Sequence, residues 1–179
     1  MHGIVFCELR RFVEEGFGHE AWGRLLAATG VPGRLHLPVT SYADGELAAL
    51  VAAASRQTGL PTAVLLERFG EVLVPAYLKL YGHLVRPEWR ALDLGEHTEE
   101  TIHKVVRVQQ PGAVPPELCC DRIRPDEVWI HYTSARRLCA VARGILRGVA
   151  AHYGERFEIE ERQCMLKGAA ECLITVVSA

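Results

Sequence analysis

The sequence lacks any long run of hydrophobic residues. No apolar stretch approaches the roughly 18 residues that a helix needs to cross a bilayer. The N-terminal region, where a secretion signal would lie, is broken up by Glu8, Arg10, Arg11, Glu14 and Glu15. The sequence therefore predicts no signal peptide and no membrane insertion, and we expect a cytoplasmic protein.

An excess of charge of one sign is also missing. The chain has 20 Lys and Arg residues and 22 Asp and Glu residues, its formal net charge is −2, and the basic residues do not gather into a stripe. Proteins that bind nucleic acids or anionic membranes through charge usually have such a stripe. The composition therefore gives no electrostatic case for a nucleic-acid partner.

Motifs of common enzymes are absent as well. The sequence contains no nucleophile–base motif, no glycine-rich phosphate loop and no HExxH-type metal motif, so we do not expect an enzyme. The six cysteines are unevenly spread, which is typical of a reduced compartment and not of a disulfide framework. Neither internal repeats nor low-complexity tracts are present.

The chain is long enough for one domain with a sizeable core, since 49% of its 179 residues are hydrophobic. Its first part, about residues 1–110, is predicted to be helical. The spacing of apolar residues predicts helices at 3–17, 19–29, 45–58, 62–81 and 87–110. A loop containing Pro32 separates the second helix from the third. We expect Asp44 to cap the third helix, Pro75 to kink or interrupt the fourth, and Gly95 to break the last.

After Pro111 the pattern changes. Strand-forming residues and one amphipathic helical pattern predict, in order, strands at 118–123 and 128–133, a helix at 135–153, and strands at 156–163 and 171–177. The second part, about residues 111–179, should therefore form an antiparallel sheet with one long helix. The predicted fold class is α+β, with the helical subdomain packed on this sheet in a single domain of residues 1–179.

A polar triplet comes at the end of the second predicted strand. Side chains at i, i+2 and i+4 of an extended chain share one face, so we expect Tyr132, Ser134 and Arg136 in a row. Arg136 can hold a carboxylate through two parallel hydrogen bonds, and the two hydroxyls add donors beside it. The triplet suggests a holder for a ligand with one or two carboxylates. The alternative is a strand end with an ordinary exposed arginine.

His103 precedes this triplet and follows the acidic residues Glu96, Glu99 and Glu100 in a segment predicted to be helical. Its imidazole can bind a metal, and Pro115-Pro116 stiffen the chain between it and the triplet. Haem has an iron that takes an axial histidine and two propionates that need cations, so it suits this combination. The other candidate ligands, each interpreted as a surface residue, are His83, His97, His131 and His152.

Together these residues resemble a known family. The motifs that support the resemblance are Met1-His2-Gly3-Ile4-Val5-Phe6, Leu50-Val51-Ala52-Ala53-Ala54-Ser55, Phe69-Gly70, the His103 segment, Pro115-Pro116, and Y-x-S-x-R at Tyr132, Ser134 and Arg136. Y-x-S-x-R is short, but its order and spacing relative to His103 and the opening motif make the combination specific. Over essentially all 179 residues the chain is similar to haem nitric oxide/oxygen-binding (H-NOX) domains, the sensor domain also found in soluble guanylate cyclase.

The resemblance implies a role for each matching residue. His103 matches the axial iron ligand, and Pro116 matches the proline that presses on the haem plane and distorts it. Tyr132, Ser134 and Arg136 match the propionate-binding triad. The implied cofactor is haem b, held between the helical part and the sheet part. The implied function is a haem-based gas sensor, in which NO weakens the bond from iron to His103 and the resulting movement alters a partner-facing surface.

The wall opposite His103 decides which gas is bound. Oxygen bound to ferrous haem needs a hydrogen-bond donor, whereas bound NO is nearly apolar. By the resemblance, Val141 lies where oxygen-binding members place a Tyr. The other matching wall positions are also apolar: Val5, Leu9, Leu73 and Ile145. The implied ligands are therefore NO and CO, unless the hydroxyl of Tyr77, at a position where the family often has Phe, points inward.

Three cysteines suggest a second possibility. Cys164 and Cys172 flank a turn that contains Gly168, and Cys139 lies in the long helix that can pack against this hairpin. A subgroup of the family has a zinc or redox cysteine cluster near these positions. With three thiolates, a zinc ion would need His152, a carboxylate or water as its fourth ligand. The alternatives are a bound zinc, redox-active thiols, or buried and free thiols, and the alternative function is a cysteine/zinc redox or small-molecule sensor on the same scaffold.

We expect the signal to pass to another protein. The sequence ends at Ala179, directly after the last predicted strand, without a segment for a kinase or cyclase output. By the resemblance, a stand-alone member contacts a signalling histidine kinase or a diguanylate cyclase/phosphodiesterase.

Overall fold

The structure is a computed structural model that describes residues 1–31, 33, 35–38, 40–110 and 112–179. Pro32 and Pro111, which marked loops in the sequence, lie outside the described residues. No helix in the described part of the chain is both long enough and apolar enough to cross a membrane.

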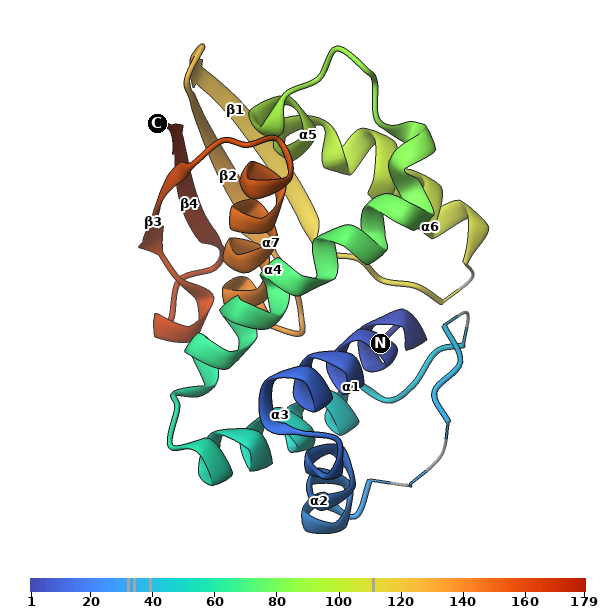
Figure 1. The fold of residues 1–179 in the computed structure, drawn as a ribbon. Coiled ribbons are helices and arrows are strands. Elements are labelled where there is room, and N and C mark those ends of the chain that lie inside the picture. Colours follow the sequence, from blue (N-terminus) through green and yellow to red (C-terminus); the bar gives the residue numbers. More distant parts are fainter. Residues whose placement is uncertain (32, 34, 39, 111) are drawn as a thin grey trace.

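Helices form the first part of the chain, and a sheet with one long helix forms the second (Figure 1). In chain order the elements are α1 Gly3–Phe17, α2 Glu20–Thr29, α3 Asp44–Thr58, α4 Thr62–Tyr81, η1 Gly82–Leu84, α5 Ala91–Thr98, η2 Glu99–His103, α6 Lys104–Gln109, β1 Glu117–Arg124, β2 Glu127–Thr133, α7 Cys139–His152, β3 Phe157–Gln163, η3 Met165–Lys167 and β4 Cys172–Ser178. The predicted α+β class is confirmed, and the four predicted strands are present.

The first core lies among α1, α2, α3 and the first half of α4. Each of these helices turns one apolar stripe inward, as the helical spacing predicts. Phe6, Leu50 and Phe69 are fully buried at its centre, and Val13 and Leu25 extend it. The N-terminal helices are therefore held together mainly by hydrophobic burial.

The second core lies on one face of a four-stranded antiparallel sheet with the strand order β1-β2-β4-β3. In the two central strands, Val128 and Ile130 of β2 point to this face, and Ile130 pairs with Ile174 of β4. The long helix α7 covers the face through Leu146, and α5 covers it through Leu92. The alternation of buried residues along β2 follows from this one-sided cover.

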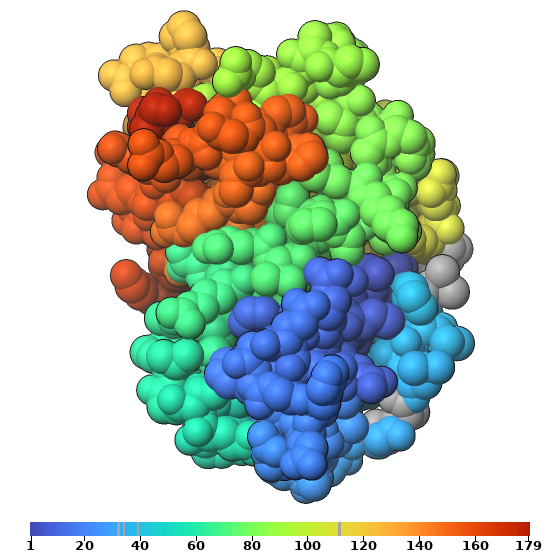
Figure 2. Space-filling model, viewed as in Figure 1, coloured from blue at the N-terminus to red at the C-terminus, as the bar shows by residue number. Residues whose placement is uncertain are grey.

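Helix α4 crosses α7 with the two backbones in contact (Figure 1). A Cβ atom on Gly144 would lie 1.9 Å from the carbonyl oxygen of Glu67, and one on Gly70 would lie 2.3 Å from that of Val141. Side chains larger than glycine do not fit at such distances, so these glycines permit the crossing. In the space-filling view, α4 separates the blue N-terminal helices from the orange α7 (Figure 2).

Of the two irregularities predicted within helices, the interruption at Pro75 does not occur, and the break near Gly95 lies further along the chain. Pro75 lies inside α4, which continues to Tyr81. A proline removes one backbone N–H, and tertiary packing of the rest of this helix keeps it continuous. Gly95 lies inside α5, and the irregular segment is instead η2, a wide π-helical turn from Glu99 to His103.

Two helix starts also differ from the prediction. Helix α7 begins at Cys139 and not at residue 135, because Ser134–Leu138 form a turn in which Arg137 has left-handed backbone geometry with φ 52°. Asp44 is the first residue of α3 and not its cap, and Ala43 occupies the cap position. The carboxylate of Asp44 is engaged by ion pairs instead.

Candidate functional site

A cavity of about 270 Å³ lies between α1, α4, α7 and the segment that runs from α5 to β1. Most of its lining is apolar. Of the residues expected to form the pocket, the cavity is lined by Val5, Leu73, Tyr77, His103, Pro116, Tyr132, Ser134, Arg136, Val141 and Ile145. Leu9 is not among the lining residues. It lies in the adjoining core, beside a second, much smaller cavity.

His103 lines this cavity from the wide turn η2. Its side chain is 15% exposed, and its Nδ1 atom lies 2.9 Å from Oε2 of Glu99, four residues earlier. Burial lowers the pKa of His103, and the hydrogen bond with Glu99 opposes this change. A neutral imidazole whose Nδ1 is already hydrogen-bonded offers Nε2 as its ligand atom.

Three groups hold the carboxylate of Glu99. Besides His103, Nη1 of Arg107 donates to its Oε1 at 2.6 Å, and the backbone N–H of Leu118 donates to its Oε2 at 3.1 Å. Burial alone raises the pKa of Glu99, but the hydrogen bonds from Arg107 and His103 outweigh burial and lower it. The sequence interpretation placed Glu99 only within an acidic cluster. Its i, i+4 spacing to His103 is the signal that could have identified its role.

Arg136 lines the cavity from the other part of the chain. Its Nε lies 2.9 Å from Oδ2 of Asp44, and Oδ1 of Asp44 lies 2.7 Å from the N-terminal ammonium of Met1. Its Nη1 donates to the carbonyl oxygen of Val114. Burial raises the pKa of Asp44, but hydrogen bonds from the N-terminus and Arg136 outweigh this and lower it. Two cations and one carboxylate leave this edge of the cavity positively charged.

The residues of the Y-x-S-x-R motif meet at the cavity, but strand alternation does not bring them there. Tyr132 belongs to β2, which ends at Thr133, whereas Ser134 and Arg136 lie in the turn that follows. The backbone N–H of Arg136 donates to Oγ of Ser134 at 3.3 Å. Burial raises the pKa of Tyr132, and a hydrogen bond with Ser134 opposes the rise. The turn, and not an extended row, places the three side chains together.

One wall of the cavity is almost entirely apolar. Its residues come from α1, α4 and α7 and include Val5, Leu73, Val141 and Ile145. Tyr77 and Tyr81, both of α4, are the polar members of this wall, and the hydroxyl of Tyr81 accepts a hydrogen bond from Nε2 of Gln110 at 3.1 Å. Burial raises the pKa of Tyr77, so its hydroxyl remains a protonated donor. This hydroxyl makes no hydrogen bond to any other residue that the structure describes.

Two residues that were not expected at the cavity line it with buried polar atoms that have no partner among the described residues. Nε2 of His2 and Oε1 of Gln110 are buried and have no hydrogen-bond partner within residues 1–31, 33, 35–38, 40–110 and 112–179. Burial, together with the nearby N-terminal charge, lowers the pKa of His2. His2 was seen only as part of a motif, and nothing in the local sequence distinguishes Gln110.

The remaining candidate histidines lie away from the cavity. His97 stacks on Trp89 with a ring separation of 4.9 Å. Nδ1 of His131 lies 2.7 Å from a carboxylate oxygen of Glu171. Neither these two nor His83 and His152 are among the described residues that line the cavity.

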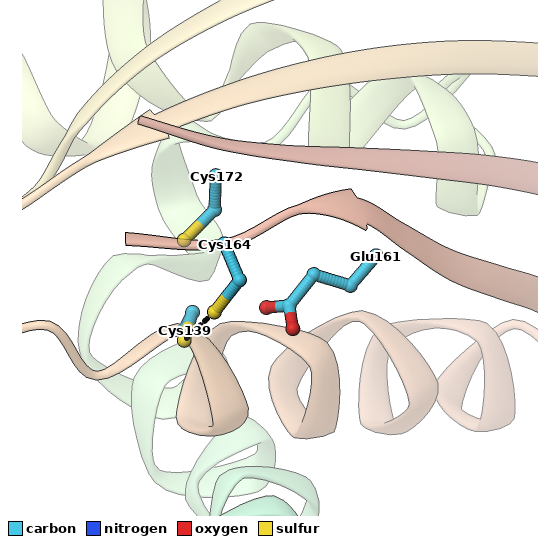
Figure 3. A group of neighbouring side chains, drawn as sticks. All are labelled: Cys139, Glu161, Cys164 and Cys172. Atoms are coloured by element: carbon cyan, nitrogen blue, oxygen red, sulfur yellow. Dashed lines mark hydrogen bonds between the residues drawn. The ribbon is translucent and has the colours of Figure 1, made fainter. Parts of the chain in front are cut away.

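The three cysteines expected to form a cluster do meet, on the buried side of the sheet (Figure 3). The Sγ atoms of Cys139 and Cys164 are 3.7 Å apart, and Cys172 lies beside them. A carboxylate oxygen of Glu161 lies within 4.8 Å of all three sulfur atoms. Glu161 also pairs with Arg143 at 2.6 Å. Burial raises the pKa of Cys139 and of Cys172, so these thiols are protonated when they are free.

The residues that line the main cavity fit a haem. The porphyrin ring needs apolar walls, its iron needs a neutral imidazole nitrogen, and its two propionates need cations and hydroxyls. The cavity provides apolar walls, His103 with Nδ1 already engaged, and Arg136 beside two hydroxyl groups. The unpartnered polar atoms of His2 and Gln110 further indicate that the cavity suits a ligand with polar groups.

Comparison with protein families agrees with this chemistry. The model of the haem-NO-binding family (HNOB) matches residues 2–161. The chain belongs to this family. Haem-NO-binding domains, also called H-NOX domains, form a family of haem-based NO and CO sensors and are not catalytic by themselves.

Individual H-NOX relatives are distant in sequence and close in fold. Soluble guanylate cyclase gcy-31 of Caenorhabditis elegans is 21% identical over 138 residues, which are 76% of this chain and 20% of that protein. The chain thus spans about a fifth of the length of this relative. An H-NOX protein from S. oneidensis in the Fe(II)NO ligation state has a TM-score of 0.93 at 25% identity, with 100% of this chain and 99% of that chain covered. The Fe(II) unliganded H-NOX protein from K. algicida has a TM-score of 0.90 at 20% identity, with 100% and 97% covered, and supports the fold alone.

Proposed function

We propose that residues 1–179 form a single domain that holds a haem b through Nε2 of His103 and senses NO and CO. The observation that supports this most strongly is that His103 and Arg136 line one apolar cavity from different parts of the chain. Membership of the haem-NO-binding family agrees with it. So do the solved Fe(II)NO and Fe(II)CO states of the S. oneidensis protein.

The residues around the cavity then have different proposed roles in holding the haem. When bound, a ferrous haem would supply an iron that can bind NO or CO. His103 orients its ring through Glu99 and offers Nε2 to the iron. Arg136, Tyr132 and Ser134 bind the propionates, and Pro116 presses on the ring plane, as the resemblance implies.

The apolar wall favours NO and CO over oxygen. Val5, Leu73, Val141 and Ile145 exclude water and offer no hydrogen-bond donor to a bound gas. Two residues of this wall carry a hydroxyl: that of Tyr81 is engaged by Gln110, whereas that of Tyr77 has no partner among the described residues, and the contribution of Tyr77 to gas binding can be measured separately.

The signal passes through the segment that bears His103. A gas can shift the conformation only if it binds one conformation better than the other. If His103 were no longer held by a haem iron, η2 and α6 would be free to move, since neither contains a buried residue. These short helices can therefore move at little cost in hydrophobic burial. The proposed receiver in the cytoplasm is a histidine kinase or a diguanylate cyclase/phosphodiesterase.

Spectroscopy of the haem-loaded protein tests this function. The ferrous protein should show an iron–histidine band, and NO and CO should each shift its Soret band. His103→Gly should lose the iron–histidine band, and added imidazole should restore it. His152→Ala, which changes a histidine outside the cavity, should behave like the unaltered protein. A protein that takes up no haem, or a His103→Gly variant with an unchanged spectrum, would contradict the proposal.

The cysteine cluster supports a second candidate function, a structural zinc site or a thiol redox sensor. Two thiolates bound to a tetrahedral zinc at 2.3 Å are about 3.8 Å apart. The observed separation of Cys139 and Cys164 is 3.7 Å. We infer that Cys139, Cys164, Cys172 and Glu161 bind zinc, with Glu161 as the carboxylate that completes four ligands.

Metal analysis separates zinc from a redox role. One zinc per chain is expected after purification without chelators, with loss of metal in Cys164→Ser and retention in the control Cys119→Ser, whose thiol is exposed. A zinc-free protein that forms a disulfide between cluster cysteines on mild oxidation would favour the redox sensor instead.

A further inference from the structure

Glu99 contacts His103, the proposed iron ligand, and can therefore affect more than the stability of the η2 turn. Its Oε2 lies 2.9 Å from Nδ1 of His103, the nitrogen that faces away from the proposed metal. The same carboxylate is fixed by Arg107 at 2.6 Å and by the backbone N–H of Leu118 at 3.1 Å. Its side chain is 25% exposed, so solvent does not fully screen the contact.

We propose that Glu99 is a positioning residue that fixes the tautomer of His103 and strengthens its bond to iron, and that Arg107 limits this effect. The inference rests on the proposed haem function. A carboxylate that accepts a hydrogen bond from Nδ1–H keeps the proton on Nδ1 and raises the basicity of Nε2. Glu99 thereby sets how firmly His103 is bound, and so how readily a gas on the opposite side releases it.

Arg107 acts in the opposite direction to Glu99. It binds Oε1 of Glu99 at 2.6 Å and draws negative charge away from the oxygen that faces His103. It also donates to the carbonyl oxygen of Pro116 at 3.3 Å, which links this network to the wall of the cavity. Removing Glu99 should therefore weaken the bond to iron, and removing the charge of Arg107 should strengthen it.

A purely structural role for Glu99 makes a different prediction. Glu99 also ties η2 to β1 through Leu118, and a glutamine could keep that hydrogen bond through its amide oxygen. A structural role would make Glu99→Gln equivalent to the unaltered protein. A charge effect on His103 would not survive this substitution, because the amide is a weaker acceptor than the carboxylate.

The first test uses the haem-free protein. Nitrogen-15 NMR of labelled histidine should show His103 in a single tautomer with the proton on Nδ1. Glu99→Ala should give a mixture of tautomers, whereas Glu100→Gln should leave the signal unchanged. Glu100 is the matched control because it is the exposed acidic neighbour in the same turn. A mixture of tautomers already present in the unaltered protein would overturn the proposal.

The second test uses the ferrous haem-loaded protein. Resonance Raman spectra should show the iron–histidine stretch shifted to lower frequency in Glu99→Gln and to higher frequency in Arg107→Met. Haem should be lost about tenfold faster from Glu99→Gln. The NO-bound form of Glu99→Gln should also contain a smaller fraction that retains His103, as its optical spectrum reports.

The outcomes distinguish this inference from the function on which it rests. If the unaltered protein shows no iron–histidine band, the proposed function fails. If the band is present but both variants leave its frequency unchanged, His103 binds iron and Glu99 is merely structural. Should Glu99→Gln fail to fold, the expected upward shift in Arg107→Met still tests the charge effect alone.

Discussion

The two parts of the chain meet in two contrasting ways. Where α4 crosses α7, backbone touches backbone, and a single methyl group on Gly144 would collide with the carbonyl oxygen of Glu67 at 1.9 Å. At the edge of the cavity, by contrast, charges form the link, since Asp44 of the helical part pairs with Arg136 from the turn after β2. The crossing admits one arrangement, whereas an ion pair can exchange its partner for another carboxylate. Helix position is thus set by packing, and the cavity edge remains adjustable.

The largest change in stability is expected from adding a side-chain atom where α4 crosses α7. Gly144→Ala should destabilise the fold by about 3 kcal/mol, because neither backbone can move aside without disturbing its core. Urea unfolding measures this change. The matched control is Gly95→Ala, whose added Cβ would meet only Cδ2 of Leu146 at 3.7 Å. This control should be neutral or stabilising by up to about 1 kcal/mol. Equal stability of the two variants would show that the crossing is looser than the distances indicate.

A smaller effect is expected at the charged edge. Asp44→Asn should cost about 0.5–1 kcal/mol at low salt and less at high salt, because the side chain is 50% exposed and screened. The pKa of Asp44 in the folded protein lies below its ordinary value of 3.8. Its contribution is therefore present above pH 3.8 and is lost as the pH falls through the lower, folded pKa.

Unfolding midpoints across this acid range check the Asp44 prediction. The stability difference between the unaltered protein and Asp44→Asn should shrink as the pH falls below 3.8. Asp126→Asn, which changes an exposed ion pair of 3.6 Å, serves as the control and should show a smaller difference. A difference for Asp44→Asn that does not vary with pH would mean that its carboxylate is not stabilised by these cations.

The smallest effect on stability is expected inside the cavity. Tyr77→Phe should change the free energy of unfolding by less than about 0.5 kcal/mol, because its hydroxyl has no partner among the described residues. In the haem-loaded protein it should lower the affinity for oxygen by about fivefold, the value of one hydrogen bond, and leave NO affinity unchanged. Gas titrations measure both. An unchanged oxygen affinity would place the hydroxyl away from the bound gas.

The fold was largely predictable because its signals are local. Apolar spacing located α1 to α4, and strand-forming residues bounded by turns located the four strands to within one or two residues. The errors occur where tertiary contacts override local preference. Pro75 is accommodated inside α4, and the irregular turn lies at Glu99–His103 and not at Gly95.

The candidate site was only partly predictable, for a related reason. The motif residues His103, Tyr132 and Arg136 line one cavity, as the resemblance implied. The groups that engage them were missed: Asp44 was interpreted as a helix cap, and Glu99 as part of an acidic cluster. The i, i+4 spacing of Glu99 to His103 was available in the sequence, whereas Asp44 acts on Arg136 across a contact that forms only in the folded chain. Glu161 beside the cysteines was missed for the same reason.

The glycine crossing has a consequence for how this protein can vary. Because its fit involves main-chain atoms, a larger residue at Gly70 or Gly144 would require the backbones of α4 and α7 to move apart. Positions such as Val5 and Val141 border open space and tolerate other sizes and polarities. In a saturation library, we therefore expect folded variants to differ in gas preference through changes at positions such as Val5 and Val141, while all of them keep glycine where α4 crosses α7.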